Sequence, residues 1–171
     1  MSMDYAQIVE GCRRRDAKAQ RALYDEMAPM AMGVCMRYAK SRADAQDIMQ
    51  DGFVKVFENV GRLRESSTLK VWVYKTMLNT CIDHCRLRKV TEPIEAYDVK
   101  AVETDPYTME EIVHAMQKLI PAQRTVFNLC DVEGYKIEEV ATKLKCSNVT
   151  VRVTLSRARK ELRELLIKMM K

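Results

Sequence analysis

The chain has 171 residues and a formal net charge of +5, with 47% apolar and 31% charged side chains. This length suits one ordinary domain or two small ones, and the apolar fraction excludes a chain that is disordered throughout. Glycine and proline are scarce, at five and four residues, whereas helix-forming residues are abundant and include 12 methionines. The composition therefore argues against a β-sandwich or barrel and predicts an all-α fold.

Apolar residues recur at helical spacing four times in the first 90 residues. Gly61 follows the third apolar stripe, where glycine is typical of a helix end, and Ser67 or Thr68 can cap the fourth helix. The polar loop RLRESST lies between the third and fourth helices. Ser41 or Asp44 can cap the third helix, and the fourth helix ends in the basic run Arg86, Arg88 and Lys89. The four apolar stripes cover residues 5–12, 19–38, 48–57 and 71–82.

Charge divides the chain into three parts. Residues 1–90 carry a net charge of +5, residues 91–110 carry −5, and residues 111–171 carry +5. The acidic stretch contains Pro93 and Pro106 and shows no clear helical period, which is typical of a linker. The sequence thus predicts two small helical domains that are joined by an acidic linker.

The last block contains shorter elements. Apolar residues from Ile112 to Leu119 share one face, and Pro121 opens the next helix because proline suits the first helical position. Glu133 and Gly134 end that helix. A short helix from Lys136 to Leu144, a turn at residues 146–148 and a long helix from Val149 to about Met169 follow.

The last two helices have the layout of a helix-turn-helix. Between Val140 and Lys160 there is no acidic residue, whereas six residues of that segment are basic. Four apolar residues of the long helix share a core face, so Arg152 and Ser156 lie on a different face. Such a basic helix predicts contact with the major groove of DNA; the alternative is an ordinary solvated helix.

No segment predicts secretion or membrane insertion. The first 20 residues lack an apolar stretch of signal-peptide length, and no run approaches about 18 apolar residues. The six cysteines are scattered through apolar helical patterns, which is typical of small buried side chains. We therefore expect a cytoplasmic protein with reduced thiols.

Several stretches, taken in order, resemble one protein family. They are AQDIMQDGFVKVF at residues 45–57, the set Trp72, Asn79, Asp83 and Arg86, IPAQRTVF at 120–127, EEVA at 138–141 and TVR at 150–152. Their order and spacing resemble those of bacterial RNA polymerase sigma factors of the extracytoplasmic-function (ECF) type. The resemblance covers nearly the whole chain. It implies a sigma domain 2 over residues 1–90, a linker over 91–110 and a sigma domain 4 over 111–171.

The first resembling stretch predicts a docking helix. Asp47, Gln50 and Asp51 fall at positions i, i+3 and i+4, so they share one helix face, and Phe53 is adjacent. The residues alone leave open an ordinary solvated face. The resemblance implies that these four residues dock on the clamp helices of the beta-prime subunit of core RNA polymerase.

The resemblance also assigns the promoter −10 element to loop 62–69 and the helix after it. A flipped base would enter a pocket there, and Asn79 can pair with a base edge through both a donor and an acceptor. Trp72 lies on an apolar face, and the sequence leaves open whether it packs in the core or stacks on a base. The candidate residues are Ser66, Ser67, Thr68, Lys75, Asn79, Asp83, Arg86, Arg88 and Lys89.

For the −35 element, the resemblance points to the final helix. Val153 and Thr154 depart from the family, which often has serine and arginine there. Because valine can contact a thymine methyl group, this departure predicts an altered −35 preference. The candidate residues are Thr150, Arg152, Val153, Ser156, Arg157, Arg159 and Lys160.

These expectations amount to a promoter-specificity subunit that binds core polymerase and promoter DNA and is restrained by an anti-sigma factor. The alternative is a stand-alone helix-turn-helix regulator that binds DNA without polymerase. We expect no enzymatic activity, no cofactor and no small-molecule substrate. We also expect no metal site, because a structural zinc site needs four ligands. A redox or metal role for Cys81, His84 and Cys85 stays open.

Overall fold

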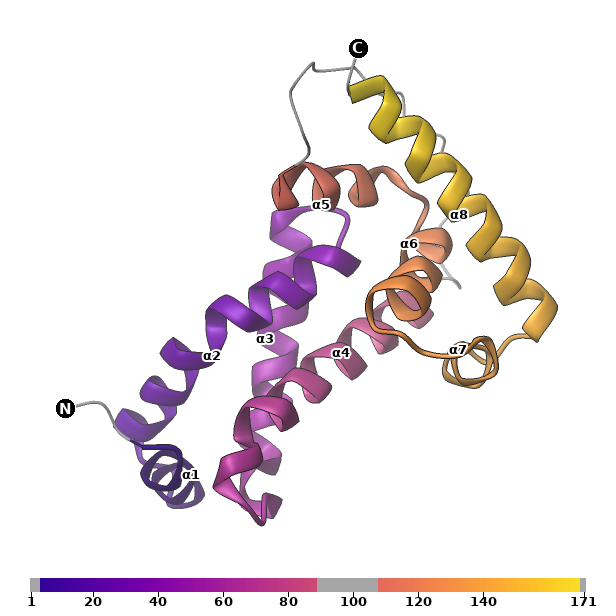
Figure 1. The fold of residues 1–171 in the computed structure, drawn as a ribbon. Coiled ribbons are helices and arrows are strands. Elements are labelled where there is room, and N and C mark those ends of the chain that lie inside the picture. Colours follow the sequence, from indigo (N-terminus) through magenta and orange to yellow (C-terminus); the bar gives the residue numbers. More distant parts are fainter. Residues whose placement is uncertain (1–3, 89–107, 170–171) are drawn as a thin grey trace. The chain divides into compact units, whose positions relative to one another are not determined.

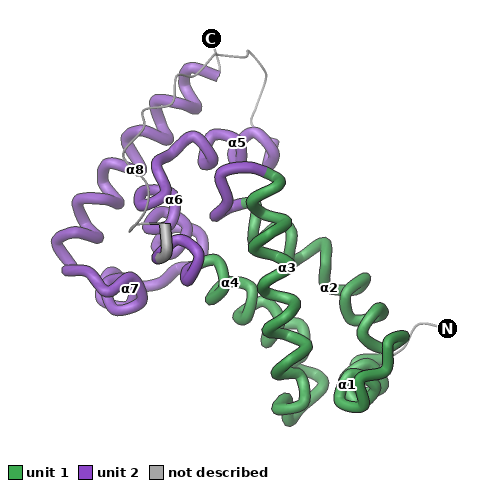
Figure 2. Tube along the Cα trace, turned by 180° about the vertical axis from the view of Figure 1, so that it is seen from behind, with its two compact units in different colours: residues 1–36, 42–81 green, residues 37–41, 82–171 purple. Residues whose placement is uncertain are grey.

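The computed structural model describes residues 4–88 and 108–169, and these residues form two compact units. One unit comprises residues 1–36 and 42–81, and the other comprises residues 37–41 and 82–171 (Figure 2). The predicted all-α fold is confirmed, since the described ranges contain helices and connecting segments but no strand. Lys89 and residues 91–107 of the predicted linker lie outside the described residues, as does the side chain of Arg88.

The first unit is built from four α-helices, labelled α1 to α4 in Figure 1, and two short 3₁₀-helices. They are α1 (Tyr5–Arg13), α2 (Ala17–Tyr38), α3 (Arg42–Asn59), η1 (Val60–Arg62), η2 (Ser66–Thr68) and α4 (Leu69–Arg88). The last residues of α2 and α4 belong to the second unit. The four predicted helices are therefore present. The chain enters α4 through η2, and the Thr68 hydroxyl donates to the carbonyl of Glu65 instead of capping α4.

Close side-chain contacts join the helices of the first unit. A Cβ atom added to Gly52 in α3 would lie 2.3 Å from the sulfur of Met77 in α4, so glycine permits this approach of the two helices. Cys35 of α2 and Cys81 of α4 are both fully buried, with their sulfur atoms 4.0 Å apart. These cysteines fill the core as small apolar side chains, as the sequence pattern predicts.

The second unit packs its long last helix against three shorter ones. Its elements are α5 (Met109–Lys118), α6 (Pro121–Phe127), the π-helical segment η3 (Asn128–Val132), α7 (Ile137–Leu144) and α8 (Asn148–Met169). Helix α8 contacts α5, α6 and α7. The contact between α5 and α8 buries Ala115, Met116, Leu119, Leu162 and Leu165.

Local chemistry sets the boundaries of these helices. Thr108 and Glu111 form a capping box at the start of α5, so this helix begins slightly before the predicted end of the linker at residue 110. Gly134 follows η3 with a φ of 76°, and Lys145 ends α7 in the left-handed region with a φ of 53°. The Ser147 hydroxyl then accepts from the Thr150 amide at 3.1 Å and caps α8.

Arg124 is a charged residue that is buried in the core of the second unit. Its side chain is buried, with 2% of the residue exposed. The guanidinium donates to the carbonyl oxygens of Met116, Gln117 and Leu119 at the end of α5, at 3.1, 2.9 and 2.8 Å. It also donates to the carbonyl of Tyr38 at 3.1 Å. The carbonyls at a helix C-terminus carry partial negative charge, which compensates the buried cation.

Two further interactions fix residue 37 within the same unit. Arg37 forms an ion pair with Glu133 at 2.6 Å, and the side chains of both residues are largely buried. The Asn128 side-chain amide donates to the carbonyl of Arg37 at 2.9 Å. The segment of residues 37–41 is therefore an integral part of the second unit, although it lies far from α6 in the sequence.

Candidate nucleic-acid and protein interfaces

Helix α3 presents one acidic and polar face. Asp47, Gln50 and Asp51 are all exposed, in agreement with their spacing. Val54 follows at i+7 from Asp47 and i+4 from Gln50, so it lies on the same face, and it is 52% exposed. We call these four residues the α3 face. The α3 face therefore combines two carboxylates, one amide and one exposed apolar side chain.

Phe53 differs from its predicted neighbours because it is only 3% exposed. Its ring packs on Tyr24 of α2, with the centroids 4.6 Å apart, and on Phe57 at 6.0 Å. Phe53 therefore stabilises α3 from within the unit, and its side chain does not form part of the exposed surface. The exposed apolar residue of the α3 face is Val54, which the helical spacing from Gln50 could have identified.

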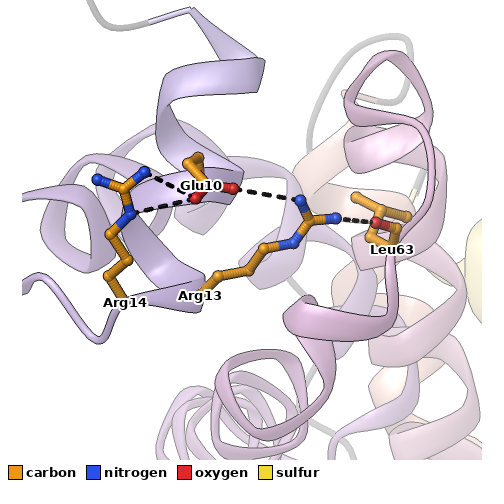
Figure 3. A network of polar contacts seen from close by, with 4 residues as sticks. All are labelled: Glu10, Arg13, Arg14 and Leu63. Carbon is orange, nitrogen blue, oxygen red and sulfur yellow. Dashed lines mark hydrogen bonds and ion pairs between the residues drawn. The ribbon is translucent and has the colours of Figure 1, made fainter.

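Helix α1 fixes the loop between α3 and α4. Helix α1 packs on both η1 and η2. Arg13 donates to the carbonyl of Leu63 at 2.5 Å and pairs with Glu10 at 3.3 Å, and Arg14 pairs with the same carboxylate at 2.9 Å (Figure 3). Hydrogen bonds from Arg14 and Arg13 lower the pKa of Glu10. The loop thus has a defined path, with Leu63 buried.

Most of the predicted −10 residues that the structure describes lie in this loop or on one face of α4. Ser67 and Thr68 are exposed, and Ser66 is half-buried. Lys75, Asn79 and Asp83 are exposed and recur every four residues, which places them on one helix face.

Two further residues of α4, Trp72 and Arg86, are half-buried and so are less exposed than Lys75, Asn79 and Asp83. Arg86 pairs with Asp83 at 3.4 Å, so the two charges partly compensate each other. Trp72 is half-buried, an exposure that suits both of the roles that the sequence leaves open.

Helix α8 has a buried side and, on another side, an exposed basic face. Val151, Leu155, Ala158 and Leu162 are buried, as their spacing predicts. Thr150 is exposed, and its hydroxyl lies 2.8 Å from that of Ser147 in the helix cap. The exposed side chains that share the basic face are Arg152, Val153, Ser156, Arg157 and Lys160.

Arg159 has a specific partner in the same unit. Its Nε and Nη2 atoms donate to the two carboxylate oxygens of Asp131 in η3, at 2.8 and 2.6 Å. This bidentate hydrogen bond raises the pKa of Arg159. The side chain is 55% exposed, yet its guanidinium is already bound, so Arg159 joins α8 to η3. Arg159 therefore has a structural role in addition to its predicted contact with the −35 element.

The comparison with known proteins identifies the family. The sequence model of Sigma-70 region 2 matches residues 23–91, and that of Sigma-70 region 4 matches residues 109–162. The RNA polymerase sigma factor SigV of Bacillus subtilis is 31% identical over 137 residues, which cover 77% of this chain and 81% of SigV. The chain belongs to the RNA polymerase sigma factors of the ECF type.

Two further relatives agree with this membership. The RNA polymerase sigma-H factor of Pseudomonas aeruginosa is 29% identical over 171 residues, covering 90% of this sigma factor and 89% of the relative. The crystal structure of the sigma factor RpoE of Bartonella quintana, in complex with the anti-sigma factor NepR, superposes with a TM-score of 0.52. At 22% identity, over 84% of this chain and 93% of that one, it supports the fold.

Membership of this family gives the overall function of the protein. A sigma factor directs promoter-specific initiation by RNA polymerase, as the sequence resemblance implies. The region 2 match includes the α3 face and the loop before α4, and the region 4 match includes α7 and residues 148–162 of α8. Helix α1, which carries Arg13, lies before the region 2 match.

Two other features of the sigma factor bear on the sequence predictions. Within residues 4–88 and 108–169, no group of three or more His, Cys, Asp and Glu side chains could hold a metal ion. Cys81 and Cys85 are buried and His84 is half-buried. None of the helices that the structure describes is long and apolar enough to span a membrane.

Proposed function

We propose that this ECF sigma factor docks on core polymerase through the α3 face and reads promoters with the α4 region and with α8. In this assignment residues 1–90 bind polymerase and the −10 element, and residues 111–171 bind the −35 element. Residues 91–110 form the linker between these two domains. The observation that carries it is the exposed basic face of α8, which belongs to a helix-turn-helix within the region 4 match.

The α3 face supports the docking assignment. Its carboxylates at Asp47 and Asp51 are exposed, although the first 90 residues as a whole carry a net charge of +5. A local acidic face suits a basic protein surface, and the exposed Val54 offers apolar contact area at the same place. The proposed partner is the clamp helices of the beta-prime subunit.

The loop before α4 supports the −10 assignment. Ser66, Ser67 and Thr68 offer hydroxyl groups there, and Lys75 and Asn79 follow on α4. Hydroxyl and amide groups can hydrogen-bond the edges of an unstacked base, while the lysine binds phosphate. The interactions of Arg13 and the burial of Leu63 define the path of this loop before DNA binds, which reduces the entropy lost on binding.

The face of α8 supports the −35 assignment. Arg152 can bind guanine through its two-pronged guanidinium, whereas Arg157 and Lys160 lie where they can bind phosphates. We propose that Arg159 contributes through its ion pair with Asp131, and that Thr150 contributes to the helix cap. Both residues would then position α8 in addition to any contact with DNA.

Regulation and cellular context follow from the family. We propose an anti-sigma protein as a further partner, because the related Bartonella quintana RpoE was crystallised with one. We also propose that the protein acts in the cytoplasm as a non-catalytic initiation factor without a cofactor.

The docking assignment is tested with the double substitution Asp47→Ala and Gln50→Ala. Both side chains are exposed, so the fold should be preserved. We expect the variant to lose affinity for core polymerase in a fluorescence anisotropy titration. The matched control is Glu164→Ala, which removes an exposed carboxylate from α8 and should leave polymerase affinity unchanged. Full polymerase affinity of the double variant would contradict the assignment.

The −35 assignment is tested separately with Arg152→Ala. Loss of one bidentate contact with a base should cost about 1–3 kcal/mol and weaken initiation only at promoters that depend on a −35 element. Equal losses at promoters with a scrambled −35 element would contradict base recognition by Arg152. Tight binding to a palindrome without polymerase would instead indicate a stand-alone regulator.

A further inference from the structure

Two valines on α8 are exposed where helices usually present polar residues. Val149 is 68% exposed and Val153 is 43% exposed. They are four residues apart, so they share one face and lie about 6 Å apart along the helix axis. The buried side of α8 is formed by other residues, from Val151 to Leu165. The two valines are therefore not part of the core, and we call them the valine strip.

Cations and hydroxyl groups surround the valine strip. Arg152 lies between the two valines in sequence, Ser156 and Arg157 follow one turn later, and all three are exposed. No acidic residue occurs between Val140 and Lys160. The strip also begins at the N-terminal end of a 22-residue helix, where the helix dipole favours phosphate. An apolar strip bordered by positive charge fits the major groove of DNA better than it fits an apolar protein surface.

The chemistry of the major groove limits what a valine can recognise there. Thymine presents a C5-methyl group in this groove, whereas the other three bases present hydrogen-bonding groups without such a methyl. A valine side chain cannot form hydrogen bonds, so its favourable contact is with that methyl. The separation of about 6 Å exceeds one base step of 3.4 Å, so the two valines can reach different bases.

We propose that Val149 and Val153 contact the C5-methyl groups of two thymines in the −35 element. Arg152 then binds a guanine close to them, so the preferred element combines guanine with nearby thymines. This inference rests on the proposed binding of α8 to −35 DNA and adds the identity of the bases. It extends the expectation for Val153, because Val149 adds a second methyl contact one helical turn away.

The test uses the full chain with core polymerase and a −35 element selected from a randomised promoter library. Each thymine of the selected element is then replaced by deoxyuridine, which lacks only the C5-methyl group. Removing one buried methyl contact should weaken promoter binding about fourfold at each of two positions. Competition binding of the holoenzyme to the two DNA forms measures this ratio.

Substitutions assign each methyl group to its valine. Val149→Ala should reduce the deoxyuridine effect at one position, and Val153→Ala should reduce it at the other, because alanine lacks the two γ-methyl groups that reach the base. Ile167→Ala is the matched control, since Ile167 is a 48% exposed aliphatic residue near the far end of α8, and it should leave both effects intact. The deoxyuridine series with the unmodified protein does not depend on how well the variants fold.

The outcomes separate this inference from the function on which it rests. A selected −35 element without thymine would overturn the proposed thymine contacts, and so would one that tolerates deoxyuridine at every position. In both cases recognition of the −35 element by α8 would still stand. Methyl effects of undiminished size in both alanine variants would also overturn it, because another residue would then make the contact. If the holoenzyme selects no −35 sequence at all, the proposed function itself fails.

Discussion

Replacement of Arg124 by methionine should destabilise the second unit more than any substitution on the DNA-binding face. Methionine keeps the length of the side chain but removes its charge and all of its donors. Four carbonyl oxygens, those of Tyr38, Met116, Gln117 and Leu119, would lose the donor that they now share. The residue is 2% exposed, so water cannot replace the guanidinium without opening the structure.

The magnitude follows from these hydrogen bonds. A hydrogen bond that involves a charged group contributes about 1.5–3 kcal/mol, but two of the four share Nη2 and neighbouring bonds are not additive. Each buried carbonyl left without a donor costs about 1–3 kcal/mol, although the four losses overlap. We therefore expect Arg124→Met to lower the free energy of unfolding of the second unit by about 3–5 kcal/mol.

Hydrogen exchange of backbone amides measures this loss in the full chain. A loss of 4 kcal/mol corresponds to exchange that is faster by about a thousandfold in peptides from α5 and α6. Arg163→Met, on the exposed side of α8, is the control and should change the free energy by less than about 0.5 kcal/mol. If exchange in α5 and α6 rises by less than about threefold in Arg124→Met, the structural role assigned to this residue is wrong.

Three further predictions concern the elements that position the promoter-binding residues. Arg13→Ala should loosen the loop at Leu63 and raise amide exchange there by about tenfold, while Arg13→Lys should partly restore it; equal exchange in all three proteins would refute the role of Arg13. Single and double alanine substitutions at Asp131 and Arg159 should give a coupling energy of about 0.5–1 kcal/mol in urea unfolding, because the pair is partly exposed; a coupling near zero would argue against the pair in solution. Lys145→Gly should stabilise the turn before α8 by about 0.5–1 kcal/mol, because glycine adopts the left-handed conformation without steric cost; Lys145→Gln controls for the lost charge, and an equal effect in both would contradict this reason.

The sequence predicts the helices well because their apolar residues recur with a clear period. Each of the predicted helices of both units is present, and Pro121 and Gly134 lie at the boundaries that their backbone preferences favour. The buried positions of α8 also follow from spacing alone. Local sequence contains this information, since the same helix period fixes both the secondary structure and the side that faces the core.

Contacts between distant residues were not predictable in the same way. The ion pair between Asp131 and Arg159 joins residues 28 apart, and the hydrogen bond between Arg13 and Leu63 joins residues 50 apart. No local period encodes such pairs, because they depend on how the helices pack. Phe53 is a related case, because it is adjacent to the polar face along the chain although its ring lies in the core.

In vitro transcription by core polymerase tests the central claim most directly. Start sites on a genomic template library would be mapped for core polymerase alone, with the intact chain, and with the Asp47→Ala and Gln50→Ala double variant. We predict a discrete set of promoters that appears only with the intact chain, is lost with the double variant and shares a −10 and a −35 element. Start sites that are the same with and without the chain would contradict its action as a sigma factor through these surfaces.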